Sequence, residues 1–336
     1  MAAQSVLVAD IGGTHARFAV AHIDADQISL SDIQDFETAR FASLTAAAKA
    51  YLATVDVRPK IACFAVAAPV DQDPIEFTNS DWQFRLDELQ SALAIEPIKI
   101  VNDFYAMAAG VACLPDAAFE IVKSGAGDPT APLLVIGPGT GLGQALIVPT
   151  SAGMRIVSTQ GGHVGFAPMN DEESEILKIM RRKHHRVSVE RLLSGEGLVN
   201  IFAAYGNLAK VKQPALQPEE ITEAARDGSS PDAKKAVALF FEILGRTAGD
   251  AVLSTGARGG VILAGGILPK NRDLLSKSKF VDGFLDKGRM RDYVDDVPVK
   301  LIVTGEAALS GAAHIATRLP ASDFVSPTKA PSVDAR

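Results

Sequence analysis

The stretch VADIGGTHAR, Val8–Arg17, determines how the rest of this chain is interpreted. An apolar run, Ser5–Asp10, ends on an acidic residue and is followed by two glycines and a threonine. A second apolar run, Arg17–Ile23, begins only a few residues later. The stretch therefore predicts a β-hairpin in which glycine supplies the backbone angles of the turn. A dinucleotide-binding Rossmann turn is excluded, because that turn joins a strand to a helix.

The same pattern recurs near the middle of the chain. The segment PLLVIGPGTGLGQALIVP, Pro132–Pro149, again predicts a strand, a glycine-rich turn and a strand. Backbone N–H groups in such turns form a concavity that binds anions, and glycine lets a phosphate approach closely. One such turn alone favours a plain hairpin, whereas two related turns and a later LAGG, Leu263–Gly266, favour a polyphosphate site. The segment lacks the Gly-Lys-Ser/Thr ending of a P-loop.

Polar side chains stand beside both turns. Thr14 and Thr140 each add a hydroxyl group next to a glycine turn. Asp10 is not expected to contact phosphate directly, because like charges repel. We expect it instead to hold Mg²⁺ through water, since this hard cation prefers oxygen ligands and keeps part of its hydration shell.

A strand-to-helix passage supplies the next candidates. In IVNDFYA, Ile100–Ala106, Asn102 and Asp103 follow an apolar strand and precede a helix. Strand ends are where α/β folds expose functional groups. Asp103 is therefore a candidate general base and Asn102 a candidate ligand for a hydroxyl group. Either residue can equally cap the helix, and this stretch alone leaves both interpretations open.

Two further candidates carry weaker signals. His163 follows two glycines in STQGGHVGFAP and is expected on a turn, where packing is the default role. Glu190, in SVERLLSGEG, is expected in a helix that Gly195 ends, which alone would make it a solvated helix residue.

The whole chain predicts an α/β protein with more than one domain or lobe. Its 336 residues exceed one typical domain, and predicted strands alternate with helices. The clearest helices are expected over Ser43–Thr54, over Ser230–Gly256 and over residues 306–317. The two strand–turn–strand units suggest two related lobes that present their glycine turns to a shared cleft. The tail from Leu319 is rich in Pro, Ser, Ala and Asp, and is expected to be disordered.

Composition restricts the partners and the compartment. The formal net charge of −7 argues against nucleic acid or an anionic membrane as the main partner. Cys63 and Cys113 lie in apolar surroundings, which favours free thiols in a reducing compartment. We find no signal peptide and no apolar run long enough to span a bilayer, so that a cytoplasmic protein is expected.

Taken in order, the motifs DIGGTHAR, VNDF, GPGTGLG, GGHVGFAP, ERLLSGEGL, LAGGILP and DKGR resemble those of bacterial ATP-dependent glucokinases. These kinases belong to the actin, hexokinase and heat-shock ATPase superfamily. The resemblance runs from about Val6 to about Thr317, and the ordered set is specific although each motif alone is weak. It implies a two-lobed actin-like ATPase (ribonuclease H-like) fold, with ATP and sugar in the interlobe cleft. Residues 1–110 with 305–318 would form the small lobe and 111–304 the large lobe, in a homodimer.

The resemblance also implies roles for single residues. Asp103 matches the catalytic base, and Asp10 lies near the Mg²⁺ that accompanies ATP. The residues implied to contact ATP are Gly12, Gly13, Thr14, Gly137, Gly139, Thr140, Gly141, Gly265 and Gly266. The residues implied to contact glucose are Asn79, Asn102, Asp103, Gln160, His163 and Glu190.

One position departs from the family pattern. Family members generally carry Glu-Gly-Gly-His at the sugar site, whereas Gln160 stands first here. Glutamine keeps an acceptor, adds a donor and loses the charge that makes such hydrogen bonds strong. The predicted function is transfer of the ATP γ-phosphate to the 6-hydroxyl of glucose. The alternatives are a kinase for another hexose and a weakly catalytic sugar-sensing paralogue.

Overall fold

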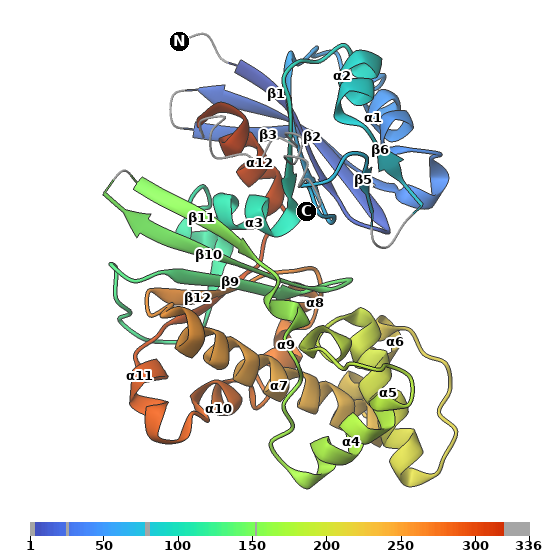
Figure 1. The fold of residues 1–336 in the computed structure, drawn as a ribbon, viewed down its shortest axis with the longest axis vertical. Coiled ribbons are helices and arrows are strands. Elements are labelled where there is room, and N and C mark those ends of the chain that lie inside the picture. The colour runs from blue at the N-terminus through green and yellow to red at the C-terminus, as the bar shows by residue number, and fades with distance from the viewer. Residues whose placement is uncertain (1–3, 25–26, 78–80, 152, 319–336) are drawn as a thin grey trace, which may run out of the picture. The chain divides into compact units, whose positions relative to one another are not determined.

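The computed structural model describes residues 4–24, 27–77, 81–151 and 153–318. The chain divides into two compact units (Figure 1). Unit 1 runs to Pro115 and resumes at Gly305, and unit 2 comprises Asp116–Thr304. Two predictions, the sugar contact of Asn79 and the disordered tail from Leu319, concern residues that lie outside the described part of the chain.

Unit 1 is built on a five-stranded sheet with the order β3-β2-β1-β4-β7. The predicted first hairpin is present, because β1 and β2 pair antiparallel, while β1, β4 and β7 run parallel. The carboxyl ends of these three strands therefore lie at one edge of the sheet. The strand bounds are β1 Gln4–Ile11, β2 His15–Asp24, β3 Gln27–Glu37, β4 Ile61–Val66 and β7 Ile98–Asn102. A separate two-stranded ribbon joins β5 Ile75–Glu76 to β6 Gln83–Phe84.

Helices cover both faces of this sheet. On one face, buried side chains of α1 (Leu44–Leu52) and α2 (Leu86–Leu93) join those of the strands in one apolar cluster. On the other face, α12 (Ala307–Arg318) packs on β1, β4 and α3 (Asp103–Val111) (Figure 1). The pair α3–α12 requires small residues, since a Cβ on Gly110 would lie 1.9 Å from the Ala307 carbonyl oxygen.

Unit 2 repeats this topology around a six-stranded sheet, β11-β10-β9-β12-β13-β8. The second predicted hairpin of the chain is present here, because β9 and β10 pair antiparallel, and β12 runs parallel to both β9 and β13. The five strands β11-β10-β9-β12-β13 thus match β3-β2-β1-β4-β7 in order and direction, as two related lobes require. The bounds are β8 Phe119–Lys123, β9 Leu133–Pro138, β10 Leu142–Thr150, β11 Gly153–Thr159, β12 Gly260–Leu263 and β13 Val299–Ile302.

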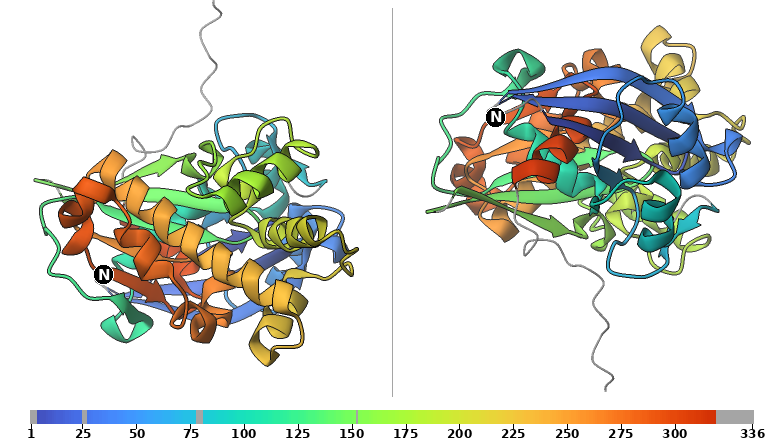
Figure 2. Two further views of the ribbon diagram at one scale, coloured as in Figure 1. Left: turned by 90° about the horizontal axis from the view of Figure 1, so that it is seen from below. Right: turned by 90° about the horizontal axis from the view of Figure 1, so that it is seen from above.

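The long helix α7 (Pro231–Thr255) is the centre of unit 2, with α5, α6 and α10 packed against it (Figures 1 and 2). It begins after the capping Ser230 and ends at Gly256, whose φ is 69°, as the sequence predicts. None of the described helices is long and apolar enough to cross a membrane. The remaining helices of unit 2 are α4 Asp171–Arg181, α5 Gly195–Ala209, α6 Pro218–Asp227, α8 Ile267–Lys270, α9 Arg272–Leu275, α10 Phe280–Leu285 and α11 Arg291–Asp295.

Candidate active site

Two carboxylates meet at the carboxyl edge of the unit 1 sheet. Asp10 stands one residue before the end of β1, and Asp103 follows β7 directly. The strand between them, β4, pairs with both, so that Val66 is in register with Ile11 on one side and with Asn102 on the other. The parallel strands therefore bring the two acids together, although 93 positions separate them in the sequence (103 − 10).

Burial changes the protonation of both acids. Desolvation raises the pKa of Asp10 to about 6, and the guanidinium of Arg17 opposes this rise. Desolvation, together with the neighbouring Asp10 charge, raises the pKa of Asp103 to about 7. A carboxyl group whose pKa lies near neutrality is suited to accept a proton at neutral pH. Asp103 therefore has the protonation behaviour of a general base.

Asn102 caps the helix that Asp103 begins. Its side-chain oxygen accepts hydrogen bonds from the backbone N–H groups of Phe104, at 3.0 Å, and Tyr105, at 3.3 Å. The capping interpretation of Asn102 is therefore correct, and the cap fixes the backbone that carries Asp103. The side-chain amide of Asn102 is a donor that these two hydrogen bonds do not use.

The first glycine turn, between β1 and β2, has two backbone N–H groups available. The buried residue Thr38 holds this turn through two hydrogen bonds. Its hydroxyl donates to the Gly13 carbonyl at 2.7 Å, and its N–H donates to the Thr14 carbonyl at 2.9 Å. Within the described part of the chain, no hydrogen-bond acceptor pairs with the N–H groups of Gly13 and Thr14. Consecutive unpaired N–H groups are the anion-binding arrangement that the sequence predicts.

The second glycine turn, between β9 and β10, is arranged alike. Gly139 donates to the Gly141 carbonyl at 2.7 Å, and its own carbonyl accepts the N–H of Gly195 at the start of α5. The N–H groups of Thr140 and Gly141 have no acceptor among the described residues. In each turn, two carbonyl groups thus accept hydrogen bonds from the protein, and two successive N–H groups are left for a ligand.

Glycine serves different purposes at these turns than the sequence suggests. The prediction that glycine supplies the backbone angles of the first turn is wrong, since neither Gly12 nor Gly13 has a positive φ. Packing within the protein does not require glycine at position 12 either, because a Cβ there would make only an ordinary contact with the His15 carbonyl, at 3.7 Å. Positive φ does occur at Gly265, where it is 85° and a Cβ would lie 2.4 Å from the Pro138 carbonyl oxygen.

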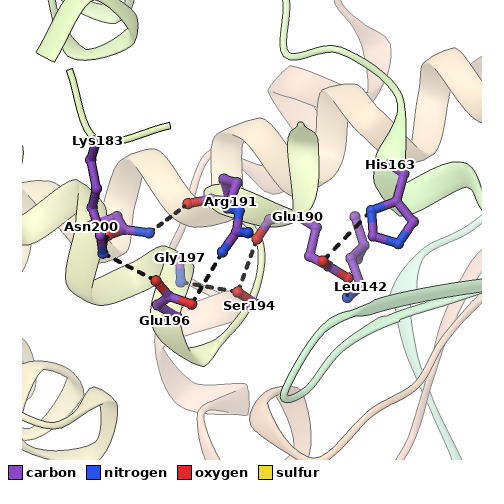
Figure 3. Close-up of polar contacts among 9 residues, drawn as sticks. All are labelled: Leu142, His163, Lys183, Glu190, Arg191, Ser194, Glu196, Gly197 and Asn200. Atoms are coloured by element: carbon purple, nitrogen blue, oxygen red, sulfur yellow. Dashed lines mark hydrogen bonds and ion pairs between the residues drawn. The ribbon is translucent and has the colours of Figure 1, made fainter. Parts of the chain in front are cut away.

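Glu190 and His163 lie together in unit 2, as Figure 3 shows. One carboxylate oxygen of Glu190 is 3.7 Å from Nδ1 of His163, and the other accepts the backbone N–H of Leu142 at 2.9 Å. The predicted sugar ligands His163 and Glu190 are therefore neighbours, and Glu190 also contacts the strand that leaves the second glycine turn.

The predicted helix around Glu190 is wrong. Glu190 belongs to a short 3-10 helix, Val189–Arg191, and Gly195 begins helix α5 rather than ending a helix. The reason is Ser194, whose hydroxyl accepts the N–H of Gly197 at 3.0 Å and donates to the Glu190 carbonyl at 2.9 Å (Figure 3). A serine before Gly195 is a favoured N-cap, and this signal was available in the sequence.

Gln160 precedes the short 3-10 helix Gly161–His163, and its carbonyl accepts the N–H of His163 at 3.0 Å. Its side chain is exposed and has no hydrogen-bond partner in the described part of the chain. The two glycines that follow are required by close packing. A Cβ on Gly161 would lie 1.8 Å from the Gln144 side chain, and one on Gly162 would lie 2.2 Å from the Leu142 carbonyl.

Arg17 and Thr38 are site residues that the sequence did not reveal. Arg17 faces Asp10 across the β1–β2 pair, donates to the Gly305 carbonyl at 2.8 Å and pairs with Asp35 at 3.2 Å. The antiparallel register of the predicted hairpin could have identified Arg17, because it pairs this residue with Asp10. No local signal points to Thr38, because it follows β3 and lies far along the chain from the turn that it contacts. Among the described residues, no cluster of three or more His, Cys, Asp or Glu side chains is arranged to hold a metal ion.

Known proteins resemble this chain over most of its length. The glucokinase family model matches residues 7–319. The glucokinase of Hahella chejuensis is 42% identical over 93% of this chain and 97% of its own, and that of Marinobacter nauticus is 41% identical over 92% and 96%. A crystal structure of glucokinase from an Antarctic psychrotroph, 34% identical, superposes with a TM-score of 0.80 over 93% of this chain and 98% of that one. The predicted α/β class and actin-like ATPase fold are confirmed, and the chain belongs to the glucokinase family.

Proposed function

We propose that this protein transfers the γ-phosphoryl group of ATP to the 6-hydroxyl of glucose, with Asp103 as the general base. The observation that carries the proposal is the pair of partly buried carboxyl groups, Asp10 and Asp103, at the ends of β1 and β7. A base within reach of a sugar hydroxyl must be deprotonated yet able to take a proton, and the pKa of about 7 at Asp103 meets both demands.

The two glycine turns supply what phosphoryl transfer needs besides the base. The transition state carries charge on the oxygens of the transferring group, and catalysis depends mainly on position and electrostatics. In the proposed reaction, the unpaired N–H groups of Gly13, Thr14, Thr140 and Gly141 donate to phosphate oxygens. The Thr140 hydroxyl adds a donor beside the γ-phosphate. Asp103 accepts the proton of the hydroxyl group as its oxygen attacks phosphorus.

Glucose is proposed to bind through hydroxyl groups. The proposed ligands, as the family resemblance implies, are Asn102, Asp103, Gln160, His163 and Glu190. The pairing of His163 with Glu190 supports this proposal, because the Glu190 carboxylate can accept hydrogen bonds from neighbouring hydroxyl groups and an N–H of the His163 imidazole can donate one.

Asp10 is the proposed site for the Mg²⁺ that arrives with ATP. Desolvation raises the pKa of Asp103 most, and the charge of Asp10 adds to this rise. A divalent cation would relieve the repulsion between these two partly buried carboxylates. Mg²⁺ is typically held by one or two carboxylates, substrate phosphates and water, which suits Asp10. When bound, Mg²⁺ supplies positive charge to the phosphate oxygens.

The test is release of ADP that depends on sugar, with the product identified by phosphorus NMR. We expect glucose 6-phosphate and one ADP for each glucose consumed. The departure at Gln160 favours including mannose, fructose and N-acetylated hexoses, because its amide offers a donor that a carboxylate lacks. Faster turnover of one of these would assign the enzyme to another hexose, and sugar binding without ADP release would assign it to a sugar sensor.

We also propose that the protein is a cytoplasmic homodimer. Cys63 and Cys113 form no disulfide with each other, which suits a reducing compartment, and the homodimer rests on the family resemblance. The net charge of −7 supports small-molecule partners rather than nucleic acid or membrane. Light scattering of the purified protein would test the homodimer.

A further inference from the structure

Glu190 makes direct contact with the second glycine turn. Its Oε2 atom accepts the N–H of Leu142, the first residue of β10, at 2.9 Å. A Cβ on Gly141 would lie 2.5 Å from this same oxygen. The carboxylate therefore fills the space that a side chain at position 141 would occupy. Its Oε1 atom faces His163 and is not used by the turn.

We propose that Glu190 is a positioning residue for the nucleotide turn as well as a sugar ligand, and that Gly141 is glycine to leave room for the Glu190 carboxylate. This inference rests on the proposed function, because it takes Glu190 as a ligand of the sugar and the turn as a ligand of ATP. The Glu190 carboxylate would then couple the binding of glucose to the binding of ATP.

The chemistry of the carboxylate allows both contacts at once. An ionised carboxylate offers about four lone-pair sites, so that it accepts the Leu142 N–H and sugar hydroxyl groups together. A sugar that fixes Glu190 also fixes the first residue after the turn. The nucleotide then binds a turn that is already ordered, which makes the binding of the two ligands cooperative. Thermodynamic linkage requires the effect to be equal in both directions.

The turn offers a matched pair of variants. Neither Gly139 nor Gly141 has a positive φ, so alanine is compatible with the backbone at both positions. A Cβ on Gly139 meets nothing within 4 Å, whereas one on Gly141 meets Glu190. Because the end of a side chain yields more easily than backbone, Gly141→Ala is expected to displace the Glu190 carboxylate. Gly139→Ala adds the same methyl group to the same turn and leaves Glu190 in place.

Calorimetry of glucose binding, with and without a non-hydrolysable ATP analogue and Mg²⁺, tests the inference on both variants. In the wild type, we expect the analogue to tighten glucose binding by about fivefold or more. Gly141→Ala should weaken glucose binding without nucleotide by roughly tenfold, the loss of one charged hydrogen bond, and should reduce the coupling. Gly139→Ala should leave glucose binding without nucleotide unchanged. Equal effects of the two variants on glucose, or no coupling in the wild type, would overturn the inference.

A second measurement does not depend on the stability of Gly141→Ala. Glu190→Ala should weaken binding of the ATP analogue in the absence of sugar by roughly fivefold, because the Leu142 N–H loses its acceptor. Unchanged analogue binding would show that Glu190 does not position the turn. Wild-type turnover separates the two claims, since a wild type that phosphorylates no hexose refutes the proposed function. Turnover of glucose without these effects refutes only the coupling.

Discussion

Asp10 and Asp103, at the carboxyl ends of β1 and β7, are close enough for the charge of Asp10 to help burial raise the pKa of Asp103 to about 7. The relationship arises from the parallel order β1-β4-β7, which aligns two distant strand ends. Asp103 can therefore accept a proton near neutral pH, and its protonation depends on the charge of Asp10.

The first prediction concerns pH. With ATP and Mg²⁺ saturating, kcat/KM for glucose should rise with pH to a plateau, because Asp103 must be deprotonated to act as a base. The midpoint should lie somewhat below the pKa of about 7 that Asp103 has without Mg²⁺, since the cation offsets the charge of Asp10. Well below the midpoint it should fall about tenfold for each unit of pH. Initial rates between pH 5.5 and 8.5 would measure this, with circular dichroism to verify folding. A profile that is flat across this range would contradict the role of Asp103.

The same pKa shift predicts an unusual dependence of stability on pH. The pKa of Asp103 is raised from 3.8 to about 7 in the folded protein, so the folded state binds more protons than the unfolded state between these values. Stability from this group is therefore lost as pH rises from about 4 to 7. Asp103→Asn should raise the free energy of unfolding by about 1–3 kcal/mol at pH 8 and have little effect at pH 4.

Denaturant unfolding at the two pH values measures this difference. Asp56→Asn, a change at an exposed carboxylate without a hydrogen-bond partner among the described residues, is the control and should alter neither value. A destabilised Asp103→Asn at pH 8 would show that the charged form of Asp103 is favoured in the folded protein.

Thr38 is predicted to affect ATP and not glucose. Its buried hydroxyl holds the Gly13 carbonyl of the first turn at 2.7 Å. Thr38→Val keeps the shape but removes the hydroxyl that holds this carbonyl, so that ATP must order a looser turn as it binds. We expect a loss of up to about 1–3 kcal/mol of binding free energy, which corresponds to a several-fold to roughly hundredfold rise in the KM for ATP. Thr38→Ser retains the hydroxyl and should restore most of the affinity. A larger effect of Thr38→Val on glucose than on ATP would contradict this assignment.

Gln160→Glu tests the departure from the family pattern. A hydrogen bond to a charged group contributes about 1 kcal/mol more than one to a neutral group, so the variant should lower the KM for glucose roughly five- to tenfold. If the KM rises, or stays the same, Gln160 is adapted to another sugar or does not contact sugar. A panel of hexoses on both forms distinguishes these outcomes, because only adaptation changes which sugar is preferred.

Local patterns in the sequence predict much of this molecule. The hairpin at Val8–Arg17, the strand end at Asn102 and the helix capped by Ser230 follow from residue types within a few positions of each other. The candidate bases and turns were identified for the same reason. The grouping of the motifs into one family depended on their order along the chain, which no single motif provides.

Features that depend on distant residues could not be predicted. Thr38 reaches the first turn only because β3 pairs with β2, and the Gly141 position is crowded only because Glu190 approaches from another loop. The helix expected at Glu190 was wrong because Gly195 was interpreted as an end signal, while the Ser194 side chain starts a helix there. Packing and register decide these contacts, and one sequence does not display them.

Single-turnover phosphorylation of glucose by the wild type and by Asp103→Asn tests the central claim most directly. Both proteins would be mixed with limiting labelled ATP, Mg²⁺ and excess glucose, and ATP affinity would be measured on the same samples. The rate constant of the variant should fall by at least ~10²–10⁴-fold, the usual contribution of a general base, while the Kd for ATP changes by only about threefold or less. A variant that keeps more than about a tenth of the wild-type rate would show that Asp103 is not the base.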